Sequence, residues 1–210
     1  MIQLDVISDP ICPWCYIGKT RLDQALAARP SHPFVIQYHP FQLNPEMPRA
    51  GTDRQSFYRD KLGGAERAAE INDAIRAAAR DSGLDFDPDA NPRIPNTLDA
   101  HRLIVWADVE GAADKVVDAL FHAYWQDGRD IGDREVLSDI ADGAGLDAAM
   151  IRRLLASDAD LTLVVERDAA FRAMGVTGVP TFIVDRKQAV SGAQPAFLWV
   201  QVIDEIAGVA

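Results

Sequence analysis

The sequence predicts an α/β fold made of a β-α-β unit, a large inserted α-helical domain and a closing β-β-α unit. The first unit opens with an apolar strand at residues 3–8. A helix with an apolar stripe follows from Pro13 to residue 29, and residues 34–39 form the next strand. Because a helix joins these two strands, we expect them to pair in parallel through a right-handed crossover.

The closing unit is predicted from the last 36 residues. Residues 181–184 and 189–190 are short apolar runs on either side of a polar turn, which indicates a β-hairpin. A helix over residues 196–207 then begins directly after Pro195.

The stretch between the two units has almost no alternation of β-branched residues and is predicted to be helical. We expect helices over residues 54–79 with a break at Gly63-Gly64, and over 97–108, 112–126, 134–144, 148–156 and 159–174. Asp133 and Asp147 are candidate N-caps. We therefore expect a sheet domain of residues 1–41 and 175–210, interrupted by an inserted α-helical domain of residues 42–174.

Composition restricts the class of protein. The chain has 210 residues, 48% of them hydrophobic, and a net charge of −11, which argues against nucleic acid and anionic membrane surfaces as partners. Residues 1–5 contain no basic segment and no long apolar run follows them, so we expect a cytoplasmic protein. The oligomeric state is left open.

The motif Cys12-Pro13-Trp14-Cys15 directly follows the first predicted strand. A pair of cysteines with this spacing at the start of a helix is typical of a redox dithiol. Free backbone N–H groups and the helix dipole favour the thiolate of the first cysteine, and Pro13 suits the first helical turn. We expect Cys12 to attack disulfides and the more buried Cys15 to resolve the mixed disulfide.

Other interpretations of the two cysteines are weaker. A structural zinc site needs four ligands, and the chain has only these two cysteines and no closely spaced pair of histidines, so no metal is expected. A static disulfide closing so short a ring would constrain little unfolded-chain entropy.

A second motif, Gly178-Val179-Pro180-Thr181, precedes the first strand of the predicted hairpin. A proline entering a strand is acceptable at its first residue, and X-Pro peptide bonds can be cis at modest cost. Alone this motif indicates only a turn. Together with the dithiol it resembles the proline loop beside the cysteine pair of thioredoxin folds, which implies a substrate site in which the backbone of Val179, before Pro180, pairs with an extended substrate chain.

These motifs resemble the DsbA-like thioredoxin family, in particular its cytoplasmic FrnE-type branch. The resemblance spans nearly the full chain and rests on Asp9, Cys12-Pro13-Trp14-Cys15, Gly18, Asn96-Thr97, Ala100-His101-Arg102, Gly128-Arg129-Asp130-Ile131, Gly175-Val176-Thr177-Gly178-Val179-Pro180 and Ser191-Gly192-Ala193-Gln194-Pro195. It implies a thioredoxin-like fold with a helical insert, and dithiol–disulfide exchange on disulfide-containing proteins or small disulfides. It implies no bound metal or organic cofactor, with glutathione as a possible co-substrate.

One position departs from the family. The best-known periplasmic members have His between the cysteines, where this chain has Trp14. An indole supplies only an N–H and bulk, so we expect the helix terminus to be the main source of Cys12 acidity. A nearby Asp9 would oppose the Cys12 thiolate, and it could either shuttle protons or cap the following helix.

The sequence leaves open the role of one helix start and the choice between function classes. His101 and Arg102, with Asn96 before them, either form a solvent-facing helix start or wall the active-site cleft.

The rival function is a glutathione-dependent isomerase or transferase, of the 2-hydroxychromene-2-carboxylate isomerase or kappa glutathione transferase type. The intact cysteine pair counts against this alternative. A third class is a chaperone that uses the apolar face of the insert. The aromatic residues of the insert, however, have the spacing expected of helix cores.

Overall fold

The structure, a computed structural model, describes residues 1–208 and contains a four-stranded sheet in the order β2-β1-β5-β6. Its strands are β1 (Ile2–Ser8), β2 (Phe34–Pro40), β5 (Thr181–Val184) and β6 (Gln188–Ser191). β1 pairs with β2 in parallel, whereas β5 is antiparallel to both β1 and β6. The predicted parallel pair and the predicted hairpin are therefore both confirmed.

The central strand β1 brings distant parts of the chain together. Its residues from Leu4 to Ser8 are all buried, because β1 has a strand on each side and helices over both faces. Ile7 lies opposite Thr181 of β5 in the antiparallel register. The carboxyl end of β1 therefore meets the segment that leads into β5.

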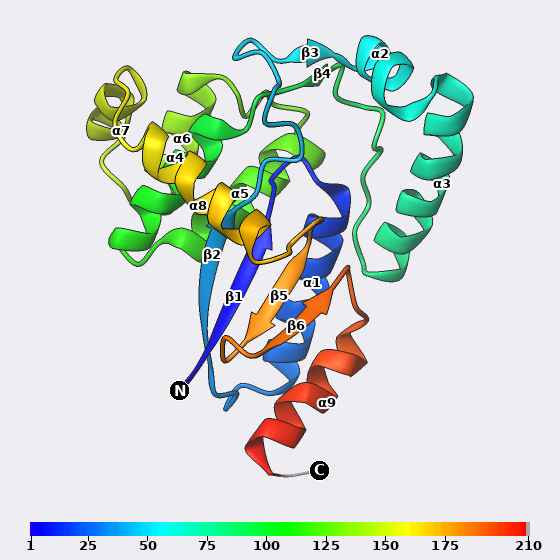
Figure 1. The fold of residues 1–210 in the computed structure, drawn as a ribbon, viewed down its shortest axis with the longest axis vertical. Helices are drawn as coiled ribbons and strands as arrows, with labels where there is room; N and C mark the ends of the chain where they lie inside the picture. Colours follow the sequence, from blue (N-terminus) through cyan, green and yellow to red (C-terminus); the bar gives the residue numbers. More distant parts are fainter. Residues whose placement is uncertain (209–210) are drawn as a thin grey trace.

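Helices cover the sheet on both faces (Figure 1). α1 (Pro13–Ala28) and α9 (Ala196–Ala207) pack together on one face, and α8 (Leu161–Ala173) crosses the other face beside β2. Phe182 of β5 and Trp199 of α9 are fully buried, with ring centroids 4.8 Å apart in an edge-to-face arrangement. This arrangement confirms the thioredoxin-like fold class.

The inserted region is helical, as predicted. It contains α2 (Arg54–Phe57), the π-helical turn η1 (Tyr58–Leu62), α3 (Ala65–Asp81), α4 (Leu98–Val109), α5 (Ala113–Trp125), α6 (Arg134–Ala144), α7 (Ala148–Leu155) and α8. The predicted break occurs at Gly63, which has a φ of +83°. Asp133 and Asp147 cap α6 and α7 by accepting backbone N–H groups. Within residues 1–208, none of the helices has the length and apolar character needed to cross a membrane.

Two short strands in this region were missed. β3 (Thr52–Asp53) and β4 (Arg93–Ile94) pair in antiparallel register beside α2. Two residues are too few to produce a visible alternation of apolar and polar side chains, so the sequence pattern could not reveal them.

Gly18 lets helix α1 approach the segment that enters β5. A Cβ added there would lie 3.0 Å from Cγ of Pro180 and 3.5 Å from the ring of Phe182. Gly143 in α6 is also helical, but a Cβ added there would meet nothing within 4 Å. Substituting Gly18 therefore tests both packing and helix propensity, whereas substituting Gly143 tests helix propensity alone.

We predict that Gly18→Val lowers the free energy of unfolding by about 1–3 kcal/mol, because the side chain overpacks the contact with Pro180. Gly143→Val is the matched control and should be neutral or slightly stabilising, since valine has a better helix propensity than glycine. Urea denaturation of both variants measures the difference. Equal changes in the two variants would show that α1 does not need glycine at this position.

Candidate active site

Cys12 is the N-cap residue of α1. Its carbonyl accepts the backbone N–H groups of Cys15 and Tyr16, at 3.0 and 3.2 Å, which starts the helix. No side chain caps this end, and the first turn contains no acidic residue. The N–H groups and the positive end of the helix dipole are therefore available to a negative charge on the Cys12 sulfur.

The sulfur of Cys12 lies against the segment before β5. Cys12 Sγ is 3.7 Å from the carbonyl oxygen of Val179, and the Val179–Pro180 peptide bond is cis. Both cysteines are free thiols and both are buried, with 4% of Cys12 and 2% of Cys15 exposed. Cys12 is thus the more exposed, as expected, but only by a small margin.

Cys15 lies behind Cys12 and does not carry a thiolate in the neutral pH range. Burial raises the pKa of the Cys15 thiol well above its usual range, and the neighbouring Cys12 thiol raises it further. The backbone of Asp9 acts in the opposite direction, but more weakly. Cys15 therefore keeps its proton until another group removes it.

Asp9 has a different role from the predicted helix cap. Its carboxylate is fully buried and accepts the backbone N–H of Leu43 at 2.8 Å and that of Ile11 at 3.4 Å. The N-cap of α1 is Cys12 itself, so the cap interpretation is wrong. Asp9 joins the end of β1 to the segment that enters the inserted region.

The three residues considered as possible cleft residues, Asn96, His101 and Arg102, are absent from the lining of the cavity beside Cys12. His101 Nε2 lies 3.7 Å from Asp9 Oδ1 and, within the described part of the chain, has no hydrogen-bond partner. Asn96 Nδ2 donates to the carbonyl of Met47. All three are buried, so the solvent-facing interpretation of this helix start is also wrong.

Arg102 is a structural anchor. Its side chain is fully buried and donates to the carboxylate of Asp99. It also donates to the carbonyl groups of Leu154, Ser157 and Ala159, all at 2.7 to 2.9 Å. Arg102 thereby fixes the link between α7 and α8 to α4.

A cavity of about 310 Å³ opens beside Cys12, between the sheet domain and the inserted region. Cys12, Pro13, Trp14 and Val179 form one part of its wall. The opposite part comes from α2, η1, α3 and α5 and includes Phe57, Leu62, Ile71, Ile75, Arg54, Tyr58, Asn72 and Tyr124. The polar residues of this wall are not evident from the sequence, because they come from separate helices and share no local spacing.

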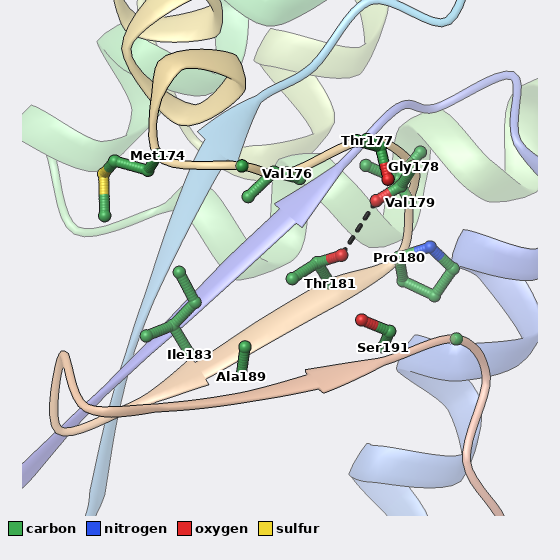
Figure 2. A pocket seen from close by; sticks show the side chains of 12 residues that line it. Met174, Val176, Thr177, Gly178, Val179, Pro180, Thr181, Ile183, Ala189 and Ser191 are labelled. Carbon is green, nitrogen blue, oxygen red and sulfur yellow. Dashed lines mark hydrogen bonds between the residues drawn. The ribbon is translucent and has the colours of Figure 1, made fainter.

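A second cavity, of about 380 Å³, also has Val179 in its wall (Figure 2). It is lined by the segment from Met174 to Thr181 and by residues of β5 and β6, including Ile183 and Ala189. Thr181 Oγ1 donates to the carbonyl of Gly178 at 2.8 Å, which shapes the loop. Val179, whose carbonyl oxygen lies 3.7 Å from the Cys12 sulfur, lines both cavities.

The raised pKa of Cys15 predicts a pH dependence of stability. The unfolded chain loses the proton of Cys15 above about pH 8.5, whereas the folded chain keeps it, so the stability of the reduced protein must fall as pH rises. Between pH 7.5 and pH 9.5 we expect Cys15 to account for a loss of up to about 1.4 kcal/mol.

Urea denaturation of the reduced protein at the two pH values, with Cys15→Ala beside Cys12→Ala, measures this contribution. The loss should be smaller in Cys15→Ala and should persist in Cys12→Ala. Burial also raises the pKa of the tyrosines Tyr38, Tyr58 and Tyr124, but an unfolded tyrosine ionises at about pH 10, so most of their effect on stability lies above this interval. The same pH dependence in Cys15→Ala and in the parent protein would refute the assignment.

Comparisons with known proteins agree with this geometry. Residues 3–204 match the model of the DSBA-like thioredoxin domain. A probable DsbA oxidoreductase from Streptomyces coelicolor is 32% identical and superposes with a TM-score of 0.87 over 100% of this chain and 92% of that protein.

Two further structures are alike in fold, each at 17% sequence identity. They are a 2-hydroxychromene-2-carboxylate isomerase, with a TM-score of 0.75 over 99% of both chains, and the cytosolic disulfide reductase DsbM from Pseudomonas aeruginosa with GSH, with a TM-score of 0.70 over 98% of this chain and 99% of that one. At this identity they support the fold alone. The family match and the Streptomyces relative go further: the chain belongs to the DsbA-like thioredoxin domain family.

Proposed function

We propose that this protein is a thiol–disulfide oxidoreductase or isomerase in which Cys12 and Cys15 are the catalytic pair. The observation that carries the proposal is the position of Cys12. It stands at the helix N-cap, beside the carbonyl of Val179 and in front of a protonated Cys15. A nucleophile, a resolving thiol and a substrate-binding backbone segment thus lie within one site.

The exchange takes place in two steps. The Cys12 thiolate attacks one sulfur of the substrate disulfide, which forms a mixed disulfide and releases the other sulfur as a thiolate. Cys15 then gives its proton to this released thiolate and attacks the Cys12 sulfur, which frees the other half of the substrate as a second thiolate that takes a proton from solvent. The substrate thus gains two electrons and becomes two thiols, and the enzyme keeps a Cys12–Cys15 disulfide.

Val179 and Pro180 are proposed to hold an extended substrate chain. Among the hydrogen bonds of residues 1–208, none uses the backbone N–H of Val179. An extended peptide can therefore pair with this residue in the manner of an added strand. Pro13, Trp14 and Asp9 shape the surroundings of the dithiol, and the inserted domain of residues 42–174 limits which substrates reach it.

The direction of exchange follows from the compartment. In the cytoplasm, where we expect the protein to act, the glutathione poise favours reduction or isomerisation over net oxidation. Reduction requires a thiol that returns the dithiol to its reduced form. The DsbM structure with GSH makes glutathione the first reductant to test.

Substituting each cysteine separates the two roles. Cys12→Ser should abolish disulfide exchange, because no thiolate remains at the helix terminus. Cys15→Ser should instead accumulate mixed disulfides at Cys12, detectable by mass spectrometry without reductant. Full exchange activity in Cys12→Ser would contradict the proposal.

Equilibration in graded glutathione redox buffers distinguishes the rival function. We expect a reversible Cys12–Cys15 disulfide with a measurable reduction potential. Tight, stoichiometric glutathione binding with no intramolecular disulfide would favour the glutathione-dependent isomerase or transferase instead.

A further inference from the structure

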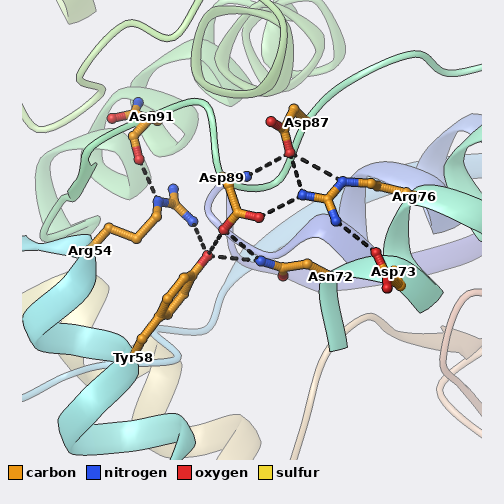
Figure 3. A network of polar contacts seen from close by, with 8 residues as sticks. All are labelled: Arg54, Tyr58, Asn72, Asp73, Arg76, Asp87, Asp89 and Asn91. Carbon is orange, nitrogen blue, oxygen red and sulfur yellow. Dashed lines mark hydrogen bonds and ion pairs between the residues drawn. The ribbon is translucent and has the colours of Figure 1, made fainter. Parts of the chain in front are cut away.

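Arg54 is a buried cation at the start of α2. Only 6% of it is exposed, and its guanidinium donates to the carbonyl of Asn91 (Figure 3). It also donates to the hydroxyl groups of Tyr58 at 3.1 Å and Tyr124 at 3.0 Å. All three acceptors are neutral oxygens.

No carboxylate of residues 1–208 pairs with Arg54. Asp89 is the carboxylate in this network, and Arg54 reaches it only through the hydroxyl of Tyr58. Asp89 itself pairs with Arg76 at 2.6 Å. Burial raises the pKa of Tyr124 to about 12, so its hydroxyl does not supply a negative charge. Arg54 is thus a desolvated charge without a counterion, which is unfavourable.

The guanidinium retains binding capacity. It has five N–H groups, and the three bonds to neutral oxygens leave one further N–H on each terminal nitrogen. Two adjacent N–H groups in a planar fork match the two oxygens of a carboxylate.

Arg54 also lines the cavity beside Cys12, and among residues 1–208 it is the only acidic or basic side chain in that wall apart from the cysteine itself and the weakly acidic tyrosines. The rest of the wall is mainly apolar, and Phe57, Leu62, Ile71 and Ile75 contribute to it. A volume of about 310 Å³ suits a small molecule. One cavity therefore combines a thiol, an apolar wall and a single uncompensated cation.

We propose that this cavity binds small organic disulfides with one carboxylate on the apolar half that enters it, so that this carboxylate lies on Arg54 and a sulfur lies at Cys12. The carboxylate supplies the missing counterion. A phosphate dianion would bring more negative charge than this one cation balances. The inference rests on the proposed exchange activity, because the Cys12 thiolate attacks the bound disulfide and releases the other half as a thiolate.

The test compares two aryl disulfides, 4,4′-dithiodibenzoate and its neutral analogue 4,4′-dithiodibenzamide. The rate at which each oxidises the reduced protein is divided by its rate with free N-acetylcysteine, which removes intrinsic reactivity. We expect the normalised ratio to favour the carboxylate by at least about tenfold in the parent protein. Arg54→Gln should remove this preference, whereas Arg54→Lys, which keeps the charge, should retain part of it.

Arg59→Gln is the matched control. It removes one positive charge from the neighbouring turn, but Arg59 is 69% exposed and does not line the cavity. The preference should be unchanged in this variant. A preference that is absent in the parent protein, that survives in Arg54→Gln, or that falls equally in Arg59→Gln would overturn the proposal.

A binding measurement covers the case in which Arg54→Gln does not fold. Calorimetry with Cys12→Ser should show 2-naphthoate binding at least about tenfold more tightly than 2-naphthamide. Equal binding would overturn the carboxylate site. Naphthoate binding in a protein that exchanges with neither disulfide would instead refute the proposed function and leave the carboxylate site standing.

Discussion

The antiparallel pairing of β1 with β5 is the constraint on which the rest of the site depends. It sets Ile7 opposite Thr181, so the turn after β1 and the loop before β5 must emerge at the same edge of the sheet. Cys12 and Val179 are 167 positions apart in sequence, yet their sulfur and oxygen lie 3.7 Å apart. Because the entropy of closing a loop grows only with the logarithm of its length, a long insertion between the two segments is tolerated.

Buried polar groups attach the insertion to the sheet near the dithiol. Asp9 accepts the backbone N–H of Leu43 where the chain leaves the sheet domain, and His101 of α4 approaches the same carboxylate. Arg102, the next residue of α4, holds the segment that leads into α8. Asp9, His101 and Arg102 belong to the motifs that carry the family resemblance. They fix the position of the insertion and are not part of the wall of the cavity beside Cys12.

The periodic patterns in the sequence predicted most helices and strands. They could not predict which of these elements contact one another. The helices of the insertion begin and end within about two residues of the expected bounds, because apolar residues at helical spacing and turn residues at the ends mark them. The dithiol was found because its chemistry lies within four consecutive residues. Arg54 and Tyr124 come into contact only when α2 and α5 pack together, so no spacing in the sequence indicates this hydrogen bond. Asp9 was misread because a cap residue is recognised by type, and here the cysteine itself occupies the N-cap position.

Val179, whose carbonyl lies beside the Cys12 sulfur, lines two cavities of different character. The loop from Met174 to Thr181 lines one of them with backbone groups that can pair with an extended chain. The wall of the other is mainly apolar and carries a single cation. Cys12 is buried and lines this apolar cavity, so a small disulfide that enters it displaces water before it meets the thiolate. Electrostatic interactions strengthen as water leaves, so one unpaired guanidinium can distinguish substrates there that it could not distinguish on an exposed surface.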